Sequence, residues 1–274
     1  GIMSGATRFT SNPKELLMAK KVSEVMLATG LFVDGFSMQT GSGGASLAVT
    51  RFVKEEVKKR DIKLSYALGG ITKPMVDLLE EGLVDTIFDV QCFDLYEAES
   101  IGKNEKHIEI SSDFYANPFN KSAAVNKLDF VILSALEIDT DFNVNVISGS
   151  DGVIRAASGG HSDTAAMAKV SIVVAPLTRG RLSTVIDKVT TVVTPGSTVD
   201  VVVTDYGVAV NPAREDLIEK FKNAGIELVT MGELRRTATR LLGTPKEIEF
   251  TDAVVAVVEY RDGSIIDVIR TRKR

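Results

Sequence analysis

The sequence is poor in the residues that build disulfide frameworks and zinc sites. Its 274 residues include one cysteine, Cys92, and two histidines. A single cysteine excludes an internal disulfide and favours a cytoplasmic location. So few thiol and imidazole ligands argue against zinc, while oxygen-ligated metals stay open. Cys92 lies in the apolar run 87–93, which predicts a packed rather than a reactive thiol.

Long apolar runs and blocks of one charge are also missing. No stretch approaches the roughly 20 apolar residues of a membrane span, and the first residues show no secretory-signal pattern. The net charge is −5 with acids and bases interspersed, so no cationic stripe indicates a nucleic-acid partner. With 44% hydrophobic and 25% charged residues, the composition predicts a folded, enzyme-sized protein. Neither a membrane nor a nucleic acid is expected as its partner.

Strand and helix signals alternate along the chain. The segment Asn12-Pro13-Lys14-Glu15 is typical of a capped helix start, and Gly30 of a helix stop. Helices are predicted at 13–29, 47–59, 73–81, 162–168, 213–224 and 232–242, and strands at 31–38, 62–68, 84–90, 128–135, 170–175, 189–193, 199–204 and 253–259. Gly69-Gly70 is predicted to be a turn, and the polar segment 104–126 a loop or lid. The alternation predicts an α/β fold, a mostly parallel sheet flanked by helices.

Two glycine-rich turns give the first chemical signal. They are Thr40-Gly41-Ser42-Gly43-Gly44 and Ser158-Gly159-Gly160-His161-Ser162-Asp163, each placed before a predicted helix. Ligands of open α/β sheets bind where strands end and helices begin, and backbone N–H groups there suit anions. Neither turn has the Gly-Lys-Ser/Thr of a nucleoside triphosphatase. Taken singly, each is equally compatible with tight-turn geometry alone.

Polar residues crowd the end of one predicted strand, in the segment 133–145. Asn143 and Asn145 stand two apart, so on an extended chain they project to one side and suit a shared carboxylate or carbonyl. Glu137 precedes them. The alternative interpretation is an Asx-rich turn.

Long consecutive stretches resemble the α subunit of citrate lyase, in the CoA-transferase superfamily. The resemblance covers nearly the whole chain and is carried by 4–8, 34–51, 67–72, 133–139, 142–146, 149–153, 158–161, 203–205 and 248–252. It implies a Rossmann-like domain of the CoA-transferase type. Residues 1–274 would be the C-terminal of two related domains, with the N-terminal domain absent and the active site between them.

The resemblance also implies an activity, a citrate CoA-transferase that exchanges acetyl for citryl on a thioester. The co-substrate is CoA or the phosphopantetheine arm of an acyl carrier protein, and no metal is expected. Partners are the β (lyase) and γ (carrier) subunits and the missing N-terminal half. Two-subunit CoA-transferases carry a nucleophilic glutamate in a Ser-Glu-Asn-Gly motif. The corresponding place here, 66–70, contains no glutamate, which favours direct attack by citrate without a covalent enzyme intermediate.

Site residues follow from this mechanism as predictions. Oxyanion donors are the backbone N–H groups of Gly43, Gly44, Gly69, Gly70, Gly159 and Gly160, with Glu137 as a hydrogen-bonding group or base. Substrate contacts are predicted for Thr40, Ser42, Arg51, Asn143, Asn145, His161 and Asp163, with Arg155 and Arg179 as further cations.

Several alternatives stay open. Arg51 also suits a surface salt bridge. His161 also suits a helix-end hydrogen bond or a packed neutral ring. For the whole chain, the rival interpretations are a ligand-sensing domain and an inactive half of a larger enzyme.

Overall fold

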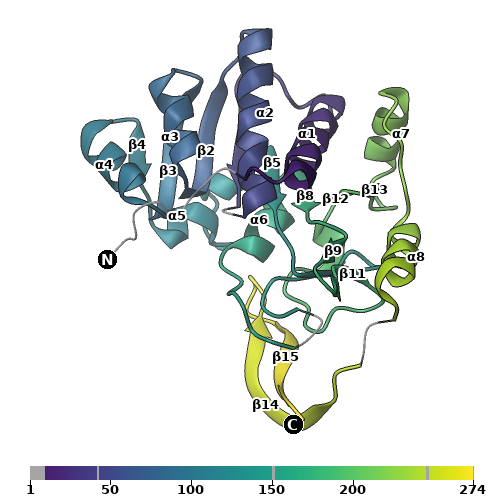
Figure 1. Ribbon diagram of the computed structural model, residues 1–274. Helices are drawn as coiled ribbons and strands as arrows, with labels where there is room; N and C mark the ends of the chain where they lie inside the picture. The colour runs from purple at the N-terminus through teal and green to yellow at the C-terminus, as the bar shows by residue number, and fades with distance from the viewer. Residues whose placement is uncertain (1–9, 42, 150–151, 245–246, 274) are drawn as a thin grey trace.

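An eight-stranded sheet forms the centre of the protein (Figure 1). The structure is a computed structural model that describes residues 10–41, 43–149, 152–244 and 247–273. The strand order is β13-β12-β8-β5-β1-β2-β3-β4, and every neighbouring pair is parallel except β12 and β13. The strands are β1 (Phe36–Thr40), β2 (Leu64–Ile71), β3 (Val84–Cys92), β4 (His107–Glu109), β5 (Phe130–Leu133), β8 (Val170–Val174), β12 (Val201–Thr204) and β13 (Gly207–Val210). This confirms the predicted α/β fold with a mostly parallel sheet.

The strand order places a topological switch point between β1 and β5. From β1 the chain builds outward to β4, then returns to the other side of β1 and builds outward from β5 to β13. At such a point the connections leave in opposite directions and open a crevice beyond the carboxyl ends of the two central strands. The fold thus indicates a ligand site beside Thr40 and Leu133.

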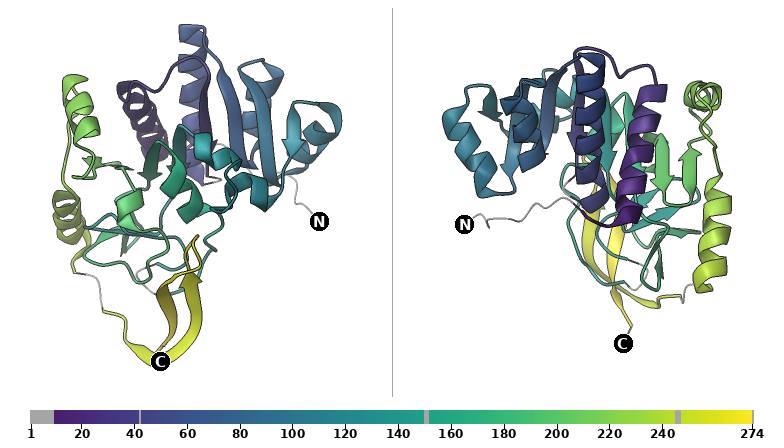
Figure 2. Two further views of the ribbon diagram at one scale, coloured as in Figure 1. Left: turned by 180° about the vertical axis from the view of Figure 1, so that it is seen from behind. Right: turned by 45° about the horizontal axis from the view of Figure 1, so that its top comes forward.

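Helices cover both faces of the sheet (Figure 2). Phe130 and Ile132 of β5 pack into the core with α1 and α2, while Val131 and Leu133 face a second core that includes residues of α5, α6 and α8. This alternation is the period-two pattern of a strand buried on both faces. The helices are α1 (Pro13–Ala28), α2 (Gly44–Arg60), α3 (Lys73–Glu80), α4 (Leu95–Lys103), α5 (Ser112–Ala116), α6 (His161–Met167), α7 (Glu215–Asn223) and α8 (Met231–Leu242), with 3-10 turns η1 (Ala124–Lys127) and η2 (Gly196–Thr198).

Smaller strands gather on the side of the sheet where β5 and β8 end (Figure 1). They form three groups, β11-β6-β7, β10-β9 and the hairpin β14-β15. Their bounds are β6 (Glu137–Asp139), β7 (Val144–Asn145), β9 (Thr178–Arg179), β10 (Leu182–Ser183), β11 (Val185–Ile186), β14 (Phe250–Glu259) and β15 (Ile265–Arg272). The hairpin, yellow in Figure 1, projects from the body of the protein.

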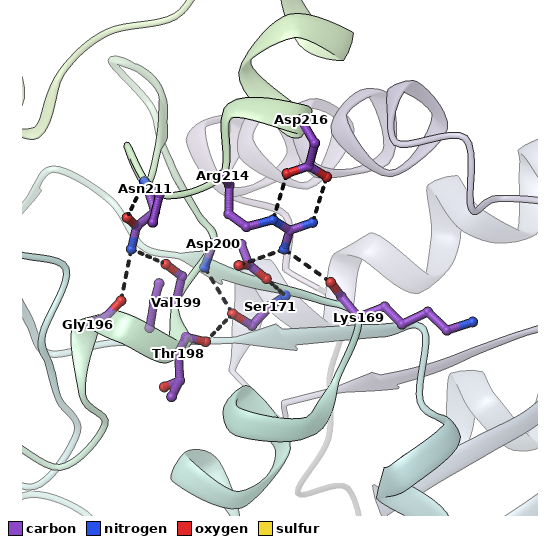
Figure 3. A network of polar contacts seen from close by, with 10 residues as sticks. Lys169, Ser171, Gly196, Thr198, Val199, Asp200, Asn211, Arg214 and Asp216 are labelled. Carbon is purple, nitrogen blue, oxygen red and sulfur yellow. Dashed lines mark hydrogen bonds and ion pairs between the residues drawn. The ribbon is translucent and has the colours of Figure 1, made fainter.

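Serine–aspartate pairs join neighbouring strands at the amino ends of the sheet's strands. The amide of Ser171 donates to Asp200 Oδ2 at 2.8 Å, and the amide of Asp200 donates to Ser171 Oγ at 3.0 Å (Figure 3). Arg214 forms an ion pair with Asp200 at 2.7 Å. Ser37 and Asp129 make the same exchange between β1 and β5, at 2.8 and 2.9 Å. The amino ends of the strands are therefore closed by paired polar groups.

Some local predictions were wrong. Gly69-Gly70 is no turn, because it lies inside β2 at a register irregularity against β3. Segment 189–193 alternates buried and half-buried residues but forms no strand, because carboxylates replace a strand partner: Thr190 N donates to Glu137 and Val192 N to Asp267. Segment 104–126 is no continuous loop; it contains β4, α5 and part of η1. No helix in the described ranges is long and apolar enough to cross a membrane.

Candidate functional site

The first glycine-rich turn lies at the switch point. Gly41 N donates to Ile132 O of β5 at 2.8 Å, and Gly43 is the N-cap of α2. A Cβ added to Gly43 would lie 3.3 Å from Ser134 Oγ, just beyond the end of β5. The turn and the end of β5 are therefore in contact, as a shared site requires. Ser42, a predicted substrate contact, lies outside the described residues.

Two charged side chains flank the start of α2. The carboxylate of Glu15 lies against Gly44, where any Cβ would collide with it. Arg179 of β9 donates from Nη2 to Ala135 O at 2.6 Å. Its guanidinium is partly covered; this burial lowers the pKa of Arg179, and the charge of Glu15 opposes the shift. Of the predicted arginines, Arg179 thus lies beside the glycine turn.

The second glycine-rich turn holds His161 in the protein interior. Its ring contacts Thr194 Oγ1 through Nδ1 at 2.7 Å and Ser134 O through Nε2 at 2.9 Å. Burial lowers the pKa of His161 to about 4, so the ring is neutral at neutral pH. The ring is therefore packed and neutral in the structure, and the predicted substrate contact of His161 stays a prediction. Its role is to tie the start of α6 to the end of β5.

Gly69 and Gly160 leave room for one polar side-chain pair. Gln39 of β1 donates from Nε2 to the Tyr115 hydroxyl of α5 at 2.8 Å, and both residues are buried. A Cβ on Gly69, whose φ is +104°, would lie 2.6 Å from Gln39 Cδ, and one on Gly160 would lie 2.7 Å from the Tyr115 ring. Gly70 likewise clears space for the Phe93 ring. These glycines are required by close packing, whatever else their N–H groups do.

An open cleft of ≈ 640 Å³ lies beyond the end of β3, between α5 and the start of α6. Tyr115, Asn117, Gly159, Gly160 and Asp163 are among its lining residues. The volume is within the range of small-molecule sites. The second glycine turn therefore borders a cleft, with Tyr115 on its wall.

Asp163 meets the tip of the projecting hairpin. Its Oδ1 pairs with Arg261 Nε at 3.5 Å. Burial raises the pKa of Asp163, and the charge of Arg261 opposes that shift. Arg261 Nη2 is buried and has no hydrogen-bond partner within the described ranges. The hairpin thus supplies a cation next to the cleft.

The acid–amide segment forms an internal network. Glu137 is fully buried and accepts from Asn145 Nδ2 at 2.8 Å, Thr190 N at 2.8 Å and Thr190 Oγ1 at 3.0 Å. Asn145 Oδ1 accepts from the amides of residues 147 and 148. Asn143 donates to Asp139 Oδ2 at 3.1 Å and accepts from Gly196 N at 2.9 Å. These polar groups hold β6, β7 and η2 together, as in the Asx-turn alternative.

The remaining predicted residues lie apart from the cleft. Arg51, on the second turn of α2, is exposed and pairs with Glu55 at 3.4 Å, which is the surface salt bridge of the alternative interpretation. Arg155 is exposed and donates to Val153 O at 3.1 Å. Thr40 is buried at the end of β1, next to the switch point. Cys92 is half-buried and burial raises its pKa to about 12, which keeps the thiol protonated and unreactive.

Sequence reasoning missed Gln39, Tyr115 and Arg261. Gln39 directly precedes the first glycine turn, so its place at a strand end was a usable signal. Tyr115 stands in a polar segment without periodicity, and Arg261 in a hairpin turn, where no local pattern marks a site. In the part of the chain that the structure describes, no group of three His, Cys, Asp or Glu residues is arranged to hold a metal.

Solved structures place this architecture among the CoA-transferase folds. A 4-hydroxybutyrate CoA-transferase from Porphyromonas gingivalis superposes with a TM-score of 0.55 at 20% identity, over 86% of this chain and 57% of that one. RipA from Yersinia pestis gives 0.57 at 18%, over 87% and 54%. At such identities the likeness shows the fold alone.

Sequence comparison identifies the family. The family described as citrate lyase, alpha subunit (CitF), matches residues 1–272, and the chain belongs to it. The citrate lyase alpha chains of Escherichia coli and Haemophilus influenzae are 58% and 59% identical, over 99% and 98% of this chain and 53% and 54% of theirs.

One relative has a solved structure with a bound ligand. A protein from Streptococcus mutans, crystallised with citrate and described as a citrate lyase alpha subunit, has a TM-score of 0.97 at 56% identity. The match covers all of this chain and 54% of the S. mutans chain. The chain therefore spans about half the length of the relatives that it matches.

Proposed function

We propose that this chain is the C-terminal α/β domain of a citrate lyase α subunit and takes part in exchanging acetyl for citryl on a thioester. The observation that carries the proposal is the 56–59% identity to such subunits over essentially the whole chain, one of them solved with citrate. In this assignment residues 1–274 form one domain, which in the whole subunit is paired with a related N-terminal domain.

The exchange proceeds by direct attack. A carboxylate oxygen of citrate adds to the acetyl thioester carbonyl, and the tetrahedral intermediate expels the thiolate to leave an acetyl–citryl anhydride. The thiolate then attacks the citryl carbonyl, the C–O bond of the anhydride breaks, and acetate leaves with that electron pair. No proton transfer is needed in either addition. The protein has to hold two acids next to one sulfur ester and stabilise an oxyanion.

The geometry of the switch point supports this assignment. Arg179 lies near Ser134 and the start of α2, where its guanidinium can give carboxylates of a trianion charge-assisted hydrogen bonds, and the carboxylate of Glu15 opposes them. Glu137 is surrounded by its own donors and is inaccessible to an acyl group. Residues 66–70, which correspond to the place of the nucleophilic glutamate in two-subunit CoA-transferases, contain no carboxylate. Holding the reactants in place is worth up to about 7 to 11 kcal/mol of barrier.

The co-substrate is CoA or the phosphopantetheine arm of an acyl carrier protein, and no metal takes part. The carrier (γ) and lyase (β) subunits of a cytoplasmic citrate lyase are the partners. In this mechanism Gly43, Gly44, Gly69, Gly70, Gly159 and Gly160 supply backbone geometry or donors, and Thr40 and Asp163 are the proposed contacts of the bound acids.

A second candidate is an inactive half-enzyme. The chain matches only 53–54% of its relatives' length, which favours a site completed by residues outside it.

One assay separates the two candidates. Acetyl-CoA and citrate are mixed with the chain alone, or with the chain plus the uncovered half of the E. coli relative, and citryl-CoA and acetate are followed by mass spectrometry. Exchange with the chain alone makes it a self-sufficient enzyme, and exchange only in the mixture makes it a half-site. No citryl-CoA in either sample, together with no calorimetric citrate binding, rejects the proposed function. A CoA adduct on one of the chain's own carboxylates would reject direct attack.

A further inference from the structure

The hairpin β14–β15 carries a group of apolar side chains that the described part of the chain leaves exposed. Residues 253–258 of β14 are Ala-Val-Val-Ala-Val-Val, a run without a polar side chain. Val254, Val255 and Val257, with Ile265 of the facing strand, are between 50% and 66% exposed. Soluble proteins rarely leave large apolar side chains gathered on one projecting element without a partner. The hairpin is therefore a candidate interaction surface.

The hairpin also lacks the support that a two-stranded sheet needs. In the described chain β14 pairs with β15 alone, and such a hairpin is at best marginally stable in water unless another layer covers it. Two polar contacts hold its direction: Asp267 Oδ2 accepts from Val192 N at 2.7 Å, and Arg261 Nε pairs with Asp163 Oδ1 at 3.5 Å. The hairpin is thus oriented in advance, so that covering it requires little further ordering.

A groove beside the hairpin continues the apolar surface. It has a volume of ≈ 410 Å³, and its lining includes Val255, Val268 and Ile269 of the hairpin together with Ile154 and Thr191 of the body. Ile154 is itself 60% exposed. Apolar side chains of a partner that covers the hairpin can therefore also fill this groove.

The length of the relatives identifies the partner. This chain covers 53% of the E. coli alpha chain and 54% of the H. influenzae one, so each of those proteins has a second half of similar length. The S. mutans protein, which is also about twice as long, superposes over the whole of this chain with a TM-score of 0.97. Its fold thus includes a counterpart of the hairpin. An exposed apolar surface is what remains when one of two packed halves is considered alone.

A second copy of this chain is the weaker candidate, because the surface is small. At about 3.4 Å per residue along the strand and about 10 Å across two strands, the run 253–257 presents on the order of 200 Å². Two independent chains need about 800 Å² each for a stable contact. A half that belongs to the same polypeptide is held nearby by the covalent link, so a small patch within a wider interface suffices.

We propose that the hairpin β14–β15 docks onto the half of the α subunit that this chain does not match, with Val254, Val255, Val257 and Ile265 packed against apolar side chains of that half. The inference rests on the proposed assignment of this chain as one half of the subunit, and it adds the surface through which the halves meet. It does not depend on the exchange reaction.

The test compares hydrogen exchange of the β14 amides in two intact proteins, this chain and the full-length S. mutans relative. Mass spectrometry follows the peptide that contains 253–257 and its counterpart. Exchange in the longer protein is expected to be at least about tenfold slower, because the hairpin has to leave its partner before it opens. The β5 peptide, which is buried in this chain, corrects for any difference in overall stability.

Val255→Asp tests the contact itself. In this chain, where the side chain is 66% exposed, the change should leave the melting temperature and β14 exchange unaltered. At the aligned position of the S. mutans protein it places a carboxylate in the interface, so β14 exchange should rise about tenfold or more. Val33→Asp is the matched control, because Val33 is 56% exposed and lies outside the hairpin; it should leave β14 exchange unaltered in both proteins.

Three results would overturn the proposal. Equal β14 exchange in the two wild-type proteins would show that the other half does not cover the hairpin, and this comparison holds even if the longer variant fails to fold. A folded longer variant with β14 exchange within about threefold of wild type would place the contact elsewhere. Light scattering that shows a dimer of this chain, dissociated by Val255→Asp, would assign the surface to a second copy. Absence of citryl-CoA in the exchange assay would instead reject the proposed function and leave the hairpin result standing.

Discussion

Glu97 is a buried acid whose neutralisation is predicted to stabilise the protein. It lies in the first turn of α4, its side chain is 0% exposed, and neither carboxylate oxygen has a hydrogen-bond partner among the described residues. Burial raises the pKa of Glu97 from 4.5 to about 7; nearby backbone amides of Asp94 and Glu97 oppose the shift, and the charges of Asp94 and Asp89 add to it. The perturbation is Glu97→Gln, which keeps the shape and removes the charge.

The size of the effect follows from proton linkage. A folded-state pKa above the unfolded one means that the folded protein binds the proton more tightly. The stability contributed by Glu97 is thus fully present below about pH 4.5 and is lost as pH rises through about 7. At about 1.4 kcal/mol for each pH unit between the two values, the loss is about 3 kcal/mol. Glutamine cannot ionise, so the variant avoids this loss.

The assay is urea unfolding of wild-type protein and variant at pH 5, 6, 7 and 8. The free energy of unfolding of Glu97→Gln minus that of wild type is expected to increase steadily over this range, by about 2 to 3 kcal/mol in total. Glu99→Gln on the same helix is the control, because the Glu99 side chain is 66% exposed and pairs with the exposed Lys103. A difference for Glu97→Gln that stays constant with pH would refute the reasoning.

Three further predictions concern other parts of the fold. Gly196→Ala places a Cβ against the backbone carbonyl of Asp141, so urea unfolding should show a loss of about 3 kcal/mol or more. Arg214→Ala leaves Asp200 without its ion pair and should cost about 1 to 3 kcal/mol by the same method, with citrate binding unchanged. Glu15→Gln removes an anion from the start of α2, so calorimetry should show citrate affinity raised by up to about fivefold, less at high salt.

The helices and most strands could be predicted from the sequence because their hydrophobic periodicity is a local property of the chain. All six predicted helices formed, and 13–29 differs by one residue from α1 (Pro13–Ala28). Local patterns failed where tertiary contacts decide the backbone. Gly69-Gly70 has turn composition, yet Gln39 and Phe93 fill the space of its missing side chains, so the glycines continue β2. In the segment 189–193, predicted as a strand, backbone N–H groups donate to the carboxylates of Glu137 and Asp267 and not to a neighbouring strand.

The candidate site was predictable in its location and unpredictable in its members. Glycine turns mark strand ends: the first contacts the end of β5 at the switch point, and the second borders the cleft beyond the end of β3. Partner choice is a long-range property: Asn145 pairs with Glu137 across β6 and β7, and Tyr115 reaches Gln39 over 76 residues of sequence. Spacing along the chain carries no signal of such contacts.

Polar groups are paired differently at the two ends of the strands. At the amino ends, Ser37 and Ser171 each accept from an aspartate amide while their own amides donate to that aspartate. At the carboxyl ends of β1 and β2, Gln39 Oε1 and Thr72 Oγ1 are buried without partners in the described chain. Stability alone favours the first arrangement, because unpaired buried groups cost about 1–3 kcal/mol each. A fold that pairs serine with aspartate at the amino ends of these strands and leaves polar groups unpaired at the carboxyl ends has unused binding groups where the crevice opens.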